Sequence, residues 1–353
     1  MLGTSIFLGE DLNNTVKKNL LSMKKHGFIG IFSSLHIPED ESAHYSKRLK
    51  VLGEWATELE MDVMVDISGS VLSKVGLSLD RPQEILAIGI KGIRIDYGVS
   101  NKQISDLSHF MKVSLNASTL TETDLVELKR EGANFNHLEA WHNYYPRPET
   151  GLDKENFTKK NQWLKQHGFR IVAFVPGDNI LRGPLFEGLP SLEKHRYSHP
   201  LDAAIELLID CLVDDIYIGE PGLKKKTQKQ FQSYFIKETM LLFAEPEQQS
   251  IYATLAVGLH QNRWDAARDV IRSADARLKK IDDIIPEYSL NRRKGSITID
   301  NQIYGRYMGE IQICLTDLSR DKKVNVVAQI VSEDLSLLKW CKGGQSFEIM
   351  LNK

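Results

Sequence analysis

Two aspartates lie near the ends of neighbouring apolar runs in the first third of the chain. Asp66 is the penultimate residue of the run at residues 62–67, and Asp96 ends the run at residues 92–96. If these runs are adjacent parallel strands, about 4.8 Å apart, the two carboxyl groups approach to about 5 Å. That separation suits the carboxylate pair of a retaining glycosidase, or a pair that shares one proton. The alternative is that one aspartate pairs with Arg94, which faces the same side of the strand as Asp96.

Polar side chains also follow the other apolar runs, which is typical of a site built where the ends of several strands meet. They are Glu10, His36, Asn116, His142, Asn143, Asp178, Arg182 and Glu220. Among these, Asn116, His142 and Asn143 are amides and imidazoles at the ends of the fifth and sixth runs.

The loop at residues 142–152 has the highest density of chemically useful side chains. Two prolines restrict its backbone, and two tyrosines can stack on a sugar or a base. Arg147 and Glu149 bring opposite charges to the same rim, so Glu149 is a substitute for either aspartate as a catalytic carboxylate. The alternative is that these two charged side chains only hold the loop in place.

The loops that follow the seventh and eighth runs could bind an anion, as the corresponding loops of many barrel enzymes do. They contain Arg182, Gly183 and Gly219. Arginine offers a bidentate pair of donors, and glycines let backbone N–H groups approach an oxyanion. We expect Arg147, Arg182 and the loop at Gly219 to bind a phosphate or a carboxylate. The glycines equally fit ordinary turns.

Other kinds of site lack their usual sequence signatures. No lysine ends a strand, which disfavours Schiff-base chemistry. No His-x-His follows the first run, and the ten histidines show no tight ligand spacing with the acids. Neither a GxGxxG nor a P-loop is present. We therefore expect no metal ion and no cofactor.

These side chains require a scaffold that brings eight strand ends together. Short β-rich runs followed by amphipathic helical stretches recur eight times, and their starts are on average about 30 residues apart, as in a (β/α)8 TIM barrel. The runs are residues 5–8, 28–32, 62–67, 92–96, 112–116, 135–141, 170–175 and 215–218. The sequence therefore predicts an α/β barrel.

The pattern changes in the last third of the chain. Predicted strands without intervening helices favour a small antiparallel β barrel or sandwich. These strands are residues 296–300, 308–315, 324–331, 336–340 and 347–351, and residues 264–271 have helical spacing. We predict a barrel domain over residues 1–240 and a β domain over residues 241–353.

Composition limits the partners. The chain has 353 residues, and its 45 Lys and Arg against 47 Asp and Glu give a net charge of −2. Nucleic acid is therefore not expected, since phosphate binding needs clustered basic residues. No signal peptide or membrane segment is predicted, and three widely spaced cysteines suit a reducing cytoplasm. A homo-oligomer stays open.

Four segments of the sequence resemble the MupG family of 6-phospho-N-acetylmuramidases over nearly the whole chain. They are residues 139–153, 94–98, 291–295 and 300–312. The resemblance implies a TIM barrel followed by a cyclophilin-like β domain. It also implies a cytoplasmic glycosidase of cell-wall recycling, which splits the phosphorylated amino-sugar disaccharide 6-phospho-N-acetylmuramyl-N-acetylglucosamine into N-acetylmuramic acid 6-phosphate and N-acetylglucosamine.

The leading hypothesis is therefore hydrolysis through an oxocarbenium-like transition state, with Asp96 and Asp66 as acid and nucleophile or base. For this substrate, we expect Asn116, His142 and Asn143 to bind sugar hydroxyl groups or the N-acetyl group. If the substrate's acetamido group is the nucleophile, one carboxylate orients it instead. Two alternatives stay open: a barrel lyase or isomerase that acts on another sugar phosphate, and a non-catalytic carbohydrate-binding protein.

Overall fold

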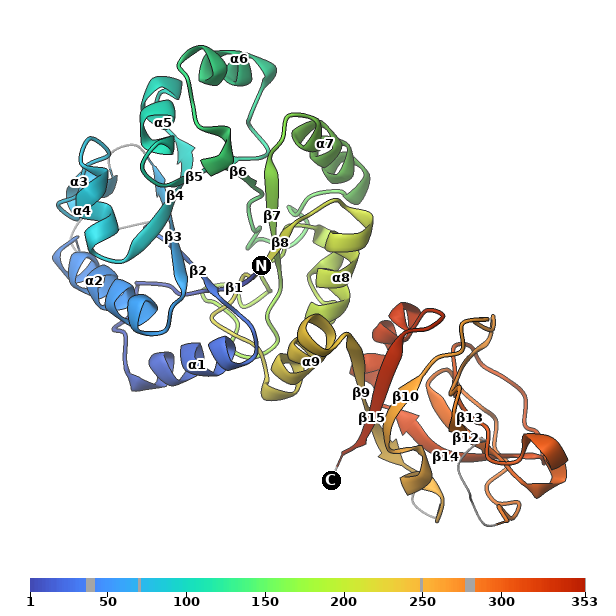
Figure 1. Ribbon diagram of the computed structural model, residues 1–353. Coiled ribbons are helices and arrows are strands. Elements are labelled where there is room, and N and C mark those ends of the chain that lie inside the picture. The colour runs from blue at the N-terminus through green and yellow to red at the C-terminus, as the bar shows by residue number, and fades with distance from the viewer. Residues whose placement is uncertain (36–41, 69–70, 248–249, 277–282, 353) are drawn as a thin grey trace. The chain divides into compact units, whose positions relative to one another are not determined.

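The computed structural model describes residues 1–35, 42–68, 71–247, 250–276 and 283–352. The chain forms two compact units, Met1–Gln228 and Lys229–Lys353, and the division falls within helix α9. In the first unit eight parallel strands close into a barrel in sequence order, and helices lie outside the strands (Figure 1). The predicted TIM barrel is confirmed.

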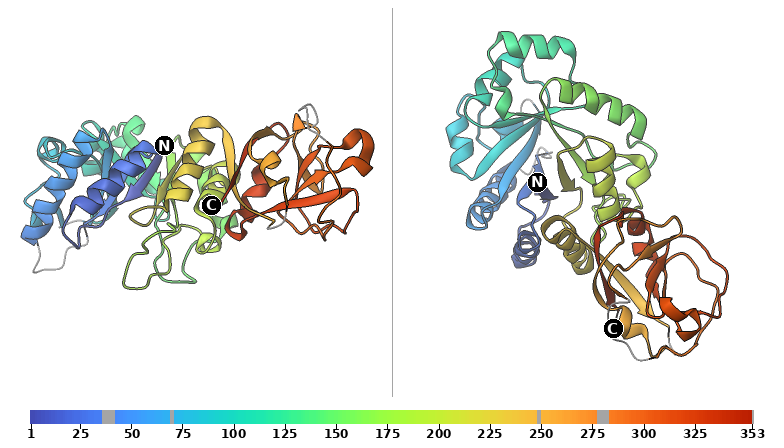
Figure 2. Two further views of the ribbon diagram at one scale, coloured as in Figure 1. Left: turned by 90° about the horizontal axis from the view of Figure 1, so that it is seen from below. Right: turned by 45° about the vertical axis from the view of Figure 1, so that its right-hand side comes forward.

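The barrel strands and the helices around them follow one another along the chain. The strands are β1 (Leu2–Ser5), β2 (Gly30–Ser34), β3 (Asp62–Ser68), β4 (Ile90–Tyr97), β5 (Lys112–Asn116), β6 (Leu138–Trp141), β7 (Arg170–Val175) and β8 (Asp215–Ile218). The helices are α1 (Asn14–Lys25), α2 (Ser42–Glu58), α3 (Val71–Lys74), α4 (Pro82–Ala87), α5 (Asn101–Ser108), α6 (Glu122–Arg130), α7 (Lys154–Gln166), α8 (Pro200–Asp210) and α9 (Lys225–Lys237), with 3₁₀ helices η2 (Phe135–His137) and η3 (Glu193–His195). Figure 2 shows the same ring of helices from two other directions.

Large aromatic side chains fill the barrel interior. Trp141 and Tyr217 lie with their ring centroids 4.6 Å apart, and both are almost fully buried. The Tyr217 side chain lies against Gly3 of β1 and Gly30 of β2, which pair with each other, and a Cβ atom at either glycine would come within 2.2 Å of it. The first strand covers Leu2–Ser5 rather than the predicted residues 5–8, because its residues from Leu2 onward pair with β8.

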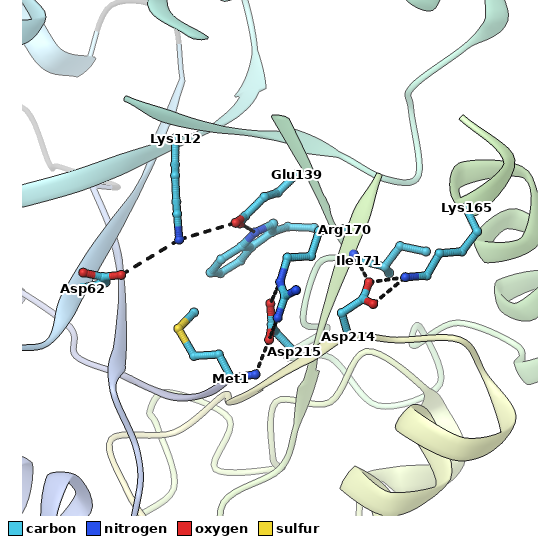
Figure 3. A network of polar contacts seen from close by, with 10 residues as sticks. Met1, Asp62, Lys112, Glu139, Lys165, Arg170, Ile171, Asp214 and Asp215 are labelled. Carbon is cyan, nitrogen blue, oxygen red and sulfur yellow. Dashed lines mark hydrogen bonds and ion pairs between the residues drawn. The ribbon is translucent and has the colours of Figure 1, made fainter. Parts of the chain in front are cut away.

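Ion pairs close the barrel at the end where the strands begin (Figure 3). Lys112 Nζ lies 3.9 Å from Asp62 Oδ2 and 3.8 Å from Glu139 Oε1, and Arg170 Nη2 donates to Asp215 Oδ1 at 2.7 Å. Burial raises the pKa of the Glu139 carboxyl. Charged residues at the strand starts thus stabilise the barrel, and the opposite end is left for the site.

The second unit is built on a seven-stranded, mostly antiparallel sheet of order β10-β15-β9-β14-β12-β13-β11. The strands are β9 (Thr239–Pro246), β10 (Gly258–Gln261), β11 (Val270–Arg272), β12 (Ser296–Asp300), β13 (Ile311–Cys314), β14 (Val324–Ile330) and β15 (Ser346–Leu351), with 3₁₀ helices η4 (Ala253–Ala256), η6 (Gln302–Tyr307) and η7 (Ser332–Trp340). One pair of strands, β15 with β9, is parallel. The two edge strands of the sheet are β10 and β11, and an antiparallel bridge joins the residues that directly follow them, Asn262 and Ser273. Within the described residues, no helix is both long and apolar enough to cross a bilayer.

The prediction of a strand at residues 336–340 is wrong, because this segment belongs to the 3₁₀ helix η7. Leu337 and Trp340 are three residues apart and therefore share its buried face. At the start of the helix, the buried carboxylate of Asp334 accepts a hydrogen bond from Phe243 N of β9. A short, mostly apolar segment of five residues did not distinguish this 3₁₀ helix from a strand.

The prediction of a helix at residues 264–271 is also wrong. The segment is irregular and leads into β11, where Ile271 pairs with Ile313 of β13. The Asn262 side chain accepts a hydrogen bond from Arg272 N, and Trp264 is 81% exposed. A helix over these residues would not be stabilised by burial of Trp264, its largest apolar side chain. Hydrogen bonding to the sheet therefore overrides the helical pattern.

Candidate active site

A cavity of about 510 Å³ opens at the end of the barrel where the strands finish. Its walls come from the last residues of β3, β4 and β7, from the loop after β6, and from the loop between β7 and η3. The lining residues are Phe32, Asp66, Arg94, Asp96, His142, Asn143, Tyr144, Pro146, Phe174, Arg182, Gly183, Pro184, Leu185, Glu187, Gly188 and Leu189. This volume lies within the range usual for small-molecule sites, about 300 to 1,000 Å³.

The guanidinium group of Arg94 joins the two aspartates on the cavity wall. Its Nη1 lies 2.5 Å from Asp66 Oδ1 and 3.4 Å from Asp96 Oδ1, and its Nη2 donates to Asn143 Oδ1. Arg94 is buried, with only 3% of its side chain exposed. The two carboxylates are therefore brought to one side of the cavity, and each pairs with the arginine between them.

Asp96 is the more accessible of the two carboxylates. Its side chain is 28% exposed, against 11% for Asp66. Asn116 Nδ2 donates to Asp96 Oδ1 at 2.9 Å, so the donors of Arg94 and Asn116 converge on one oxygen. This arrangement fixes the carboxylate and leaves its other oxygen, Oδ2, for a ligand. Asn116 acts on the cavity through Asp96 and does not line it.

His142 and Asn143 follow β6 and both line the cavity. His142 Nε2 lies 2.6 Å from Asn161 Oδ1, and the Asn161 amide in turn donates to Cys211 O. Burial lowers the pKa of His142 to about 4, so this histidine is neutral at physiological pH. Because Asn161 presents its oxygen, Nε2 carries the proton of the neutral ring.

A second arginine lies on the wall formed by the loop after β7. Arg182 Nη1 donates to Tyr144 Oη at 2.8 Å, and its guanidinium carbon lies 3.9 Å from the centroid of the Phe7 ring. Among the described side chains, its partners are thus a phenol and an aromatic face, neither of which carries a negative charge. The remaining N–H groups of Arg182 suit an anionic ligand.

Buried Arg196 holds the two loops that form much of the cavity wall. Its Nη1 donates to Tyr145 O at 2.8 Å and to Gly188 O at 3.0 Å, and its Nη2 donates to Arg147 O at 3.1 Å. The same guanidinium forms a bidentate ion pair with Glu193. Glu193 in turn accepts hydrogen bonds from the backbone of the loop after β6, and its pKa is lowered to about 2, mainly by Arg196.

Several residues predicted from the sequence lie elsewhere. Arg147 and Glu149 are exposed and do not line the cavity, and Glu149 has a φ of 71° at the turn where Glu193 accepts its N–H. Gly219 is buried against Leu189, and a Cβ atom there would lie 2.3 Å from Leu189 O. Glu10 is exposed, and His36 lies outside the described residues.

Two further strand-end acids hold loops in place. Asp178 accepts hydrogen bonds from Lys224 N and Thr227 Oγ1 at the start of α9. Glu220 is fully buried and its Oε2 accepts from Gly177 N. Burial raises the pKa of the Glu220 carboxyl to about 7. Neither residue lines the cavity.

One acidic residue of the cavity wall is absent from the sequence-based set. Glu187 lines the cavity from the loop between β7 and η3, and Tyr197 Oη donates to its Oε2 at 2.7 Å. The candidates predicted from the sequence lie close to strand ends, whereas Glu187 lies far along its loop from the end of β7 at Val175. Two features of the sequence point to this loop as part of a site: its length, and its glycines and proline at residues 183–188.

Two family models match the chain. The model described as 6-phospho-N-acetylmuramidase, N-terminal, matches residues 2–233, and the model described as 6-phospho-N-acetylmuramidase, C-terminal, matches residues 240–350. A search of the curated proteins found no match.

Two solved structures share both units with this chain. A conserved protein of unknown function from Enterococcus faecalis is 45% identical, with a TM-score of 0.92, and the match covers 100% of this chain and 96% of that chain. An uncharacterised protein from B. cereus is 25% identical, with a TM-score of 0.74 and 99% of each chain covered. The arrangement of a barrel followed by a β unit is therefore not peculiar to this chain.

Proposed function

Since the chain belongs to the MupG family of 6-phospho-N-acetylmuramidases, which are glycosidases, we propose that it hydrolyses 6-phospho-N-acetylmuramyl-N-acetylglucosamine. The products are N-acetylmuramic acid 6-phosphate and N-acetylglucosamine. The observation that carries the proposal is that one cavity combines a fixed, accessible carboxylate, Asp96, with an arginine that pairs with no carboxylate among the described residues, Arg182.

Asp96 is the carboxylate that faces the reacting carbon. Glycoside hydrolysis develops positive charge at the anomeric carbon, and a negatively charged oxygen held beside it stabilises the transition state. Arg94 and Asn116 fix Asp96 through Oδ1, so Oδ2 needs no reorganisation when the charge develops. Asp66, which is less exposed, keeps Arg94 in position.

Arg182 binds the anionic group of the sugar. Its stacking on Phe7 and its hydrogen bond to Tyr144 orient the guanidinium plane. A phosphate accepts two parallel hydrogen bonds from such a group, and the lactyl carboxylate has the same fork geometry. Asn143 and His142 line the same cavity and bind hydroxyl or acetamido groups.

The proposal is tested by measuring release of N-acetylglucosamine from the disaccharide with and without its 6-phosphate. A hydrogen bond to a charged group contributes about 1.5 to 3 kcal/mol, so we expect kcat/KM to be about 10- to 100-fold higher for the phosphorylated form. Arg182→Gln should remove most of this preference. No hydrolysis of the phosphorylated disaccharide by the purified protein would contradict the proposal.

We also propose that the reaction takes place in the cytoplasm, on disaccharide that is phosphorylated during cell-wall recycling. The phosphorylated substrate supports this location, because phosphate groups are added to sugars inside the cell. Cells that lack the gene should accumulate the phosphorylated disaccharide in the cytoplasmic fraction. Accumulation outside the cell would contradict the location.

A further inference from the structure

A glycosidase requires a second group across the scissile bond from its charged carboxylate. In the usual mechanisms this is a carboxylic acid that protonates the departing oxygen. Three carboxyl groups line the cavity among the described residues: Asp66, Asp96 and Glu187. Their hydrogen-bond partners differ, and we use this difference to assign each carboxyl group a role as charged carboxylate or as acid.

The two aspartates are arranged as hydrogen-bond acceptors. Asp66 Oδ1 and Asp96 Oδ1 both face Arg94 Nη1, at 2.5 and 3.4 Å. Arginine has only donors and does not release its proton in proteins, so the oxygens that face it act as acceptors. A pair held on the same guanidinium also lies on one side of the cavity and does not flank a bond.

Glu187 belongs to a loop that leaves a different part of the barrel mouth. In the closed barrel of eight strands, β7 is four strands from β3, which carries Asp66, and three from β4, which carries Asp96, so the end of β7 lies across the mouth from both aspartates (Figure 1). The loop that follows β7 carries Glu187, and the loop lines the cavity from residue 182 to residue 189. A sugar bound between Asp96 and this loop therefore has a carboxyl group on each face.

The position of Glu187 is fixed by its neighbours. The carbonyl of the next residue, Gly188, accepts a hydrogen bond from buried Arg196 at 3.0 Å. Tyr197 Oη donates to Glu187 Oε2 at 2.7 Å, and Glu187 raises the pKa of that phenol, so Tyr197 remains a donor. Oε1 accepts no hydrogen bond from any described residue and is the oxygen that is able to carry the exchangeable proton.

We propose that Glu187 is the general acid of this glycosidase, an inference that rests on the proposed hydrolysis. In the first step the Glu187 proton passes to the glycosidic oxygen as its bond to the anomeric carbon breaks, and N-acetylglucosamine leaves as the neutral alcohol. Water then adds to the anomeric carbon. The proton lost by that water restores the acid, so one water is consumed for each bond that is cleaved.

The test compares two leaving groups in Glu187→Gln. A general acid contributes about 10²- to 10⁴-fold to the departure of a poor leaving group. We expect the variant to lose at least about 100-fold in kcat on the phosphorylated disaccharide. On the 4-nitrophenyl glycoside of N-acetylmuramic acid 6-phosphate, whose leaving group needs no proton, the loss should stay below about 10-fold. A purely structural defect would lower both rates equally.

Two further measurements complete the test. Tyr197→Phe, which loses the hydroxyl that donates to Glu187 Oε2, should slow hydrolysis of the disaccharide more than that of the 4-nitrophenyl glycoside. Glu155→Gln, which removes an exposed carboxylate on α7, should leave both rates unchanged. Wild-type hydrolysis together with full Glu187→Gln activity on the disaccharide would overturn this inference alone. A wild-type protein inactive on both substrates would overturn the proposed function instead.

Discussion

Arg94 and Asp66 form an ion pair on the cavity wall, in which Nη1 lies 2.5 Å from Oδ1 and the side chains are only 3% and 11% exposed. A buried charge is costly unless it has a partner of opposite charge. Arg94 contacts two carboxylates among the described residues, and the contact with Asp66 is shorter than the one with Asp96. The pair thereby holds the arginine that orients Asp96. We therefore expect stability and catalysis to depend on different members of the same cluster.

The first prediction concerns stability. Among the described residues, Asp66→Asn leaves the buried guanidinium with Asp96, at the longer distance, as its carboxylate partner, so we expect the free energy of unfolding to fall by about 2 to 4 kcal/mol. Urea denaturation followed by circular dichroism measures the change. Glu84→Gln is a matched control, since Glu84 pairs with Arg81 on the exposed surface, and its cost should be below about 1 kcal/mol. Equal costs would contradict the buried pair's role.

The second prediction separates catalysis from stability. Asp96→Asn removes the accessible carboxylate but keeps the Arg94–Asp66 pair, so its free energy of unfolding should change by less than about 1.5 kcal/mol. Its kcat on the phosphorylated disaccharide should fall by about 10²- to 10⁴-fold, because the charge that faces the anomeric carbon is lost. A variant with normal kcat would show that Asp96 serves only to support Arg94.

Periodicity placed most of the barrel correctly. The predicted runs at residues 112–116, 170–175 and 215–218 coincide with β5, β7 and β8, because parallel strands buried on both faces are continuous apolar segments. Strand ends then indicated Asp66 and Asp96. Strand spacing predicted that these two aspartates lie close together. The alternative prediction, that one of them pairs with Arg94, holds for both aspartates.

The conformations of the loops at the barrel mouth could not be predicted from the sequence pattern. Glu149 and Glu187 are both glutamates on loops at the barrel mouth, yet only Glu187 lines the cavity. The positive φ of Glu149 and the hydrogen bonds that Arg196 donates to carbonyl groups of both loops decide this difference. The contact from Arg196 to Arg147 O joins residues 49 positions apart without any sequence period, so no local pattern indicates it.

The third prediction tests Arg196. Lysine offers three donors on one nitrogen and does not reproduce the bidentate pair with Glu193 together with the bonds to Gly188 and Arg147. We expect Arg196→Lys to lower the free energy of unfolding by about 2 to 4 kcal/mol and to raise KM more than it lowers kcat. Arg130→Lys, at a mostly exposed arginine, is the control. Unchanged stability and KM would contradict the role assigned to Arg196.

The fourth prediction is a pH dependence. The pKa of Glu220 is raised by burial to about 7 from an ordinary value of 4.5, so between these pH values the folded state keeps a proton that the unfolded state has released. The contribution of Glu220 to stability therefore falls as pH rises from 4.5 to 7, by about 3 kcal/mol.

Glu220→Gln removes this titration, because glutamine has no proton to lose. Relative to wild type, the variant should gain about 2 to 3 kcal/mol in free energy of unfolding between pH 5 and pH 8. Contributions from His142 and Asp300, whose pKa values are also displaced, are common to both proteins and cancel in the difference. Parallel stability curves for the two proteins over this range would show that Glu220 is not protonated in the fold at neutral pH.

The last prediction concerns Gly219, which lies at the end of β8 behind the cavity wall. A methyl group there would lie 2.3 Å from Leu189 O and 2.5 Å from Leu189 Cβ, so the backbone of Leu189, which lines the cavity, must move. We expect Gly219→Ala to lower the free energy of unfolding by about 1 to 3 kcal/mol and to raise KM for the phosphorylated disaccharide. Gly9→Ala is the matched control, because the nearest atom to its new methyl group is Tyr45 Oη at 3.8 Å. If the glycine served only as a flexible turn, the two alanine variants would have the same KM.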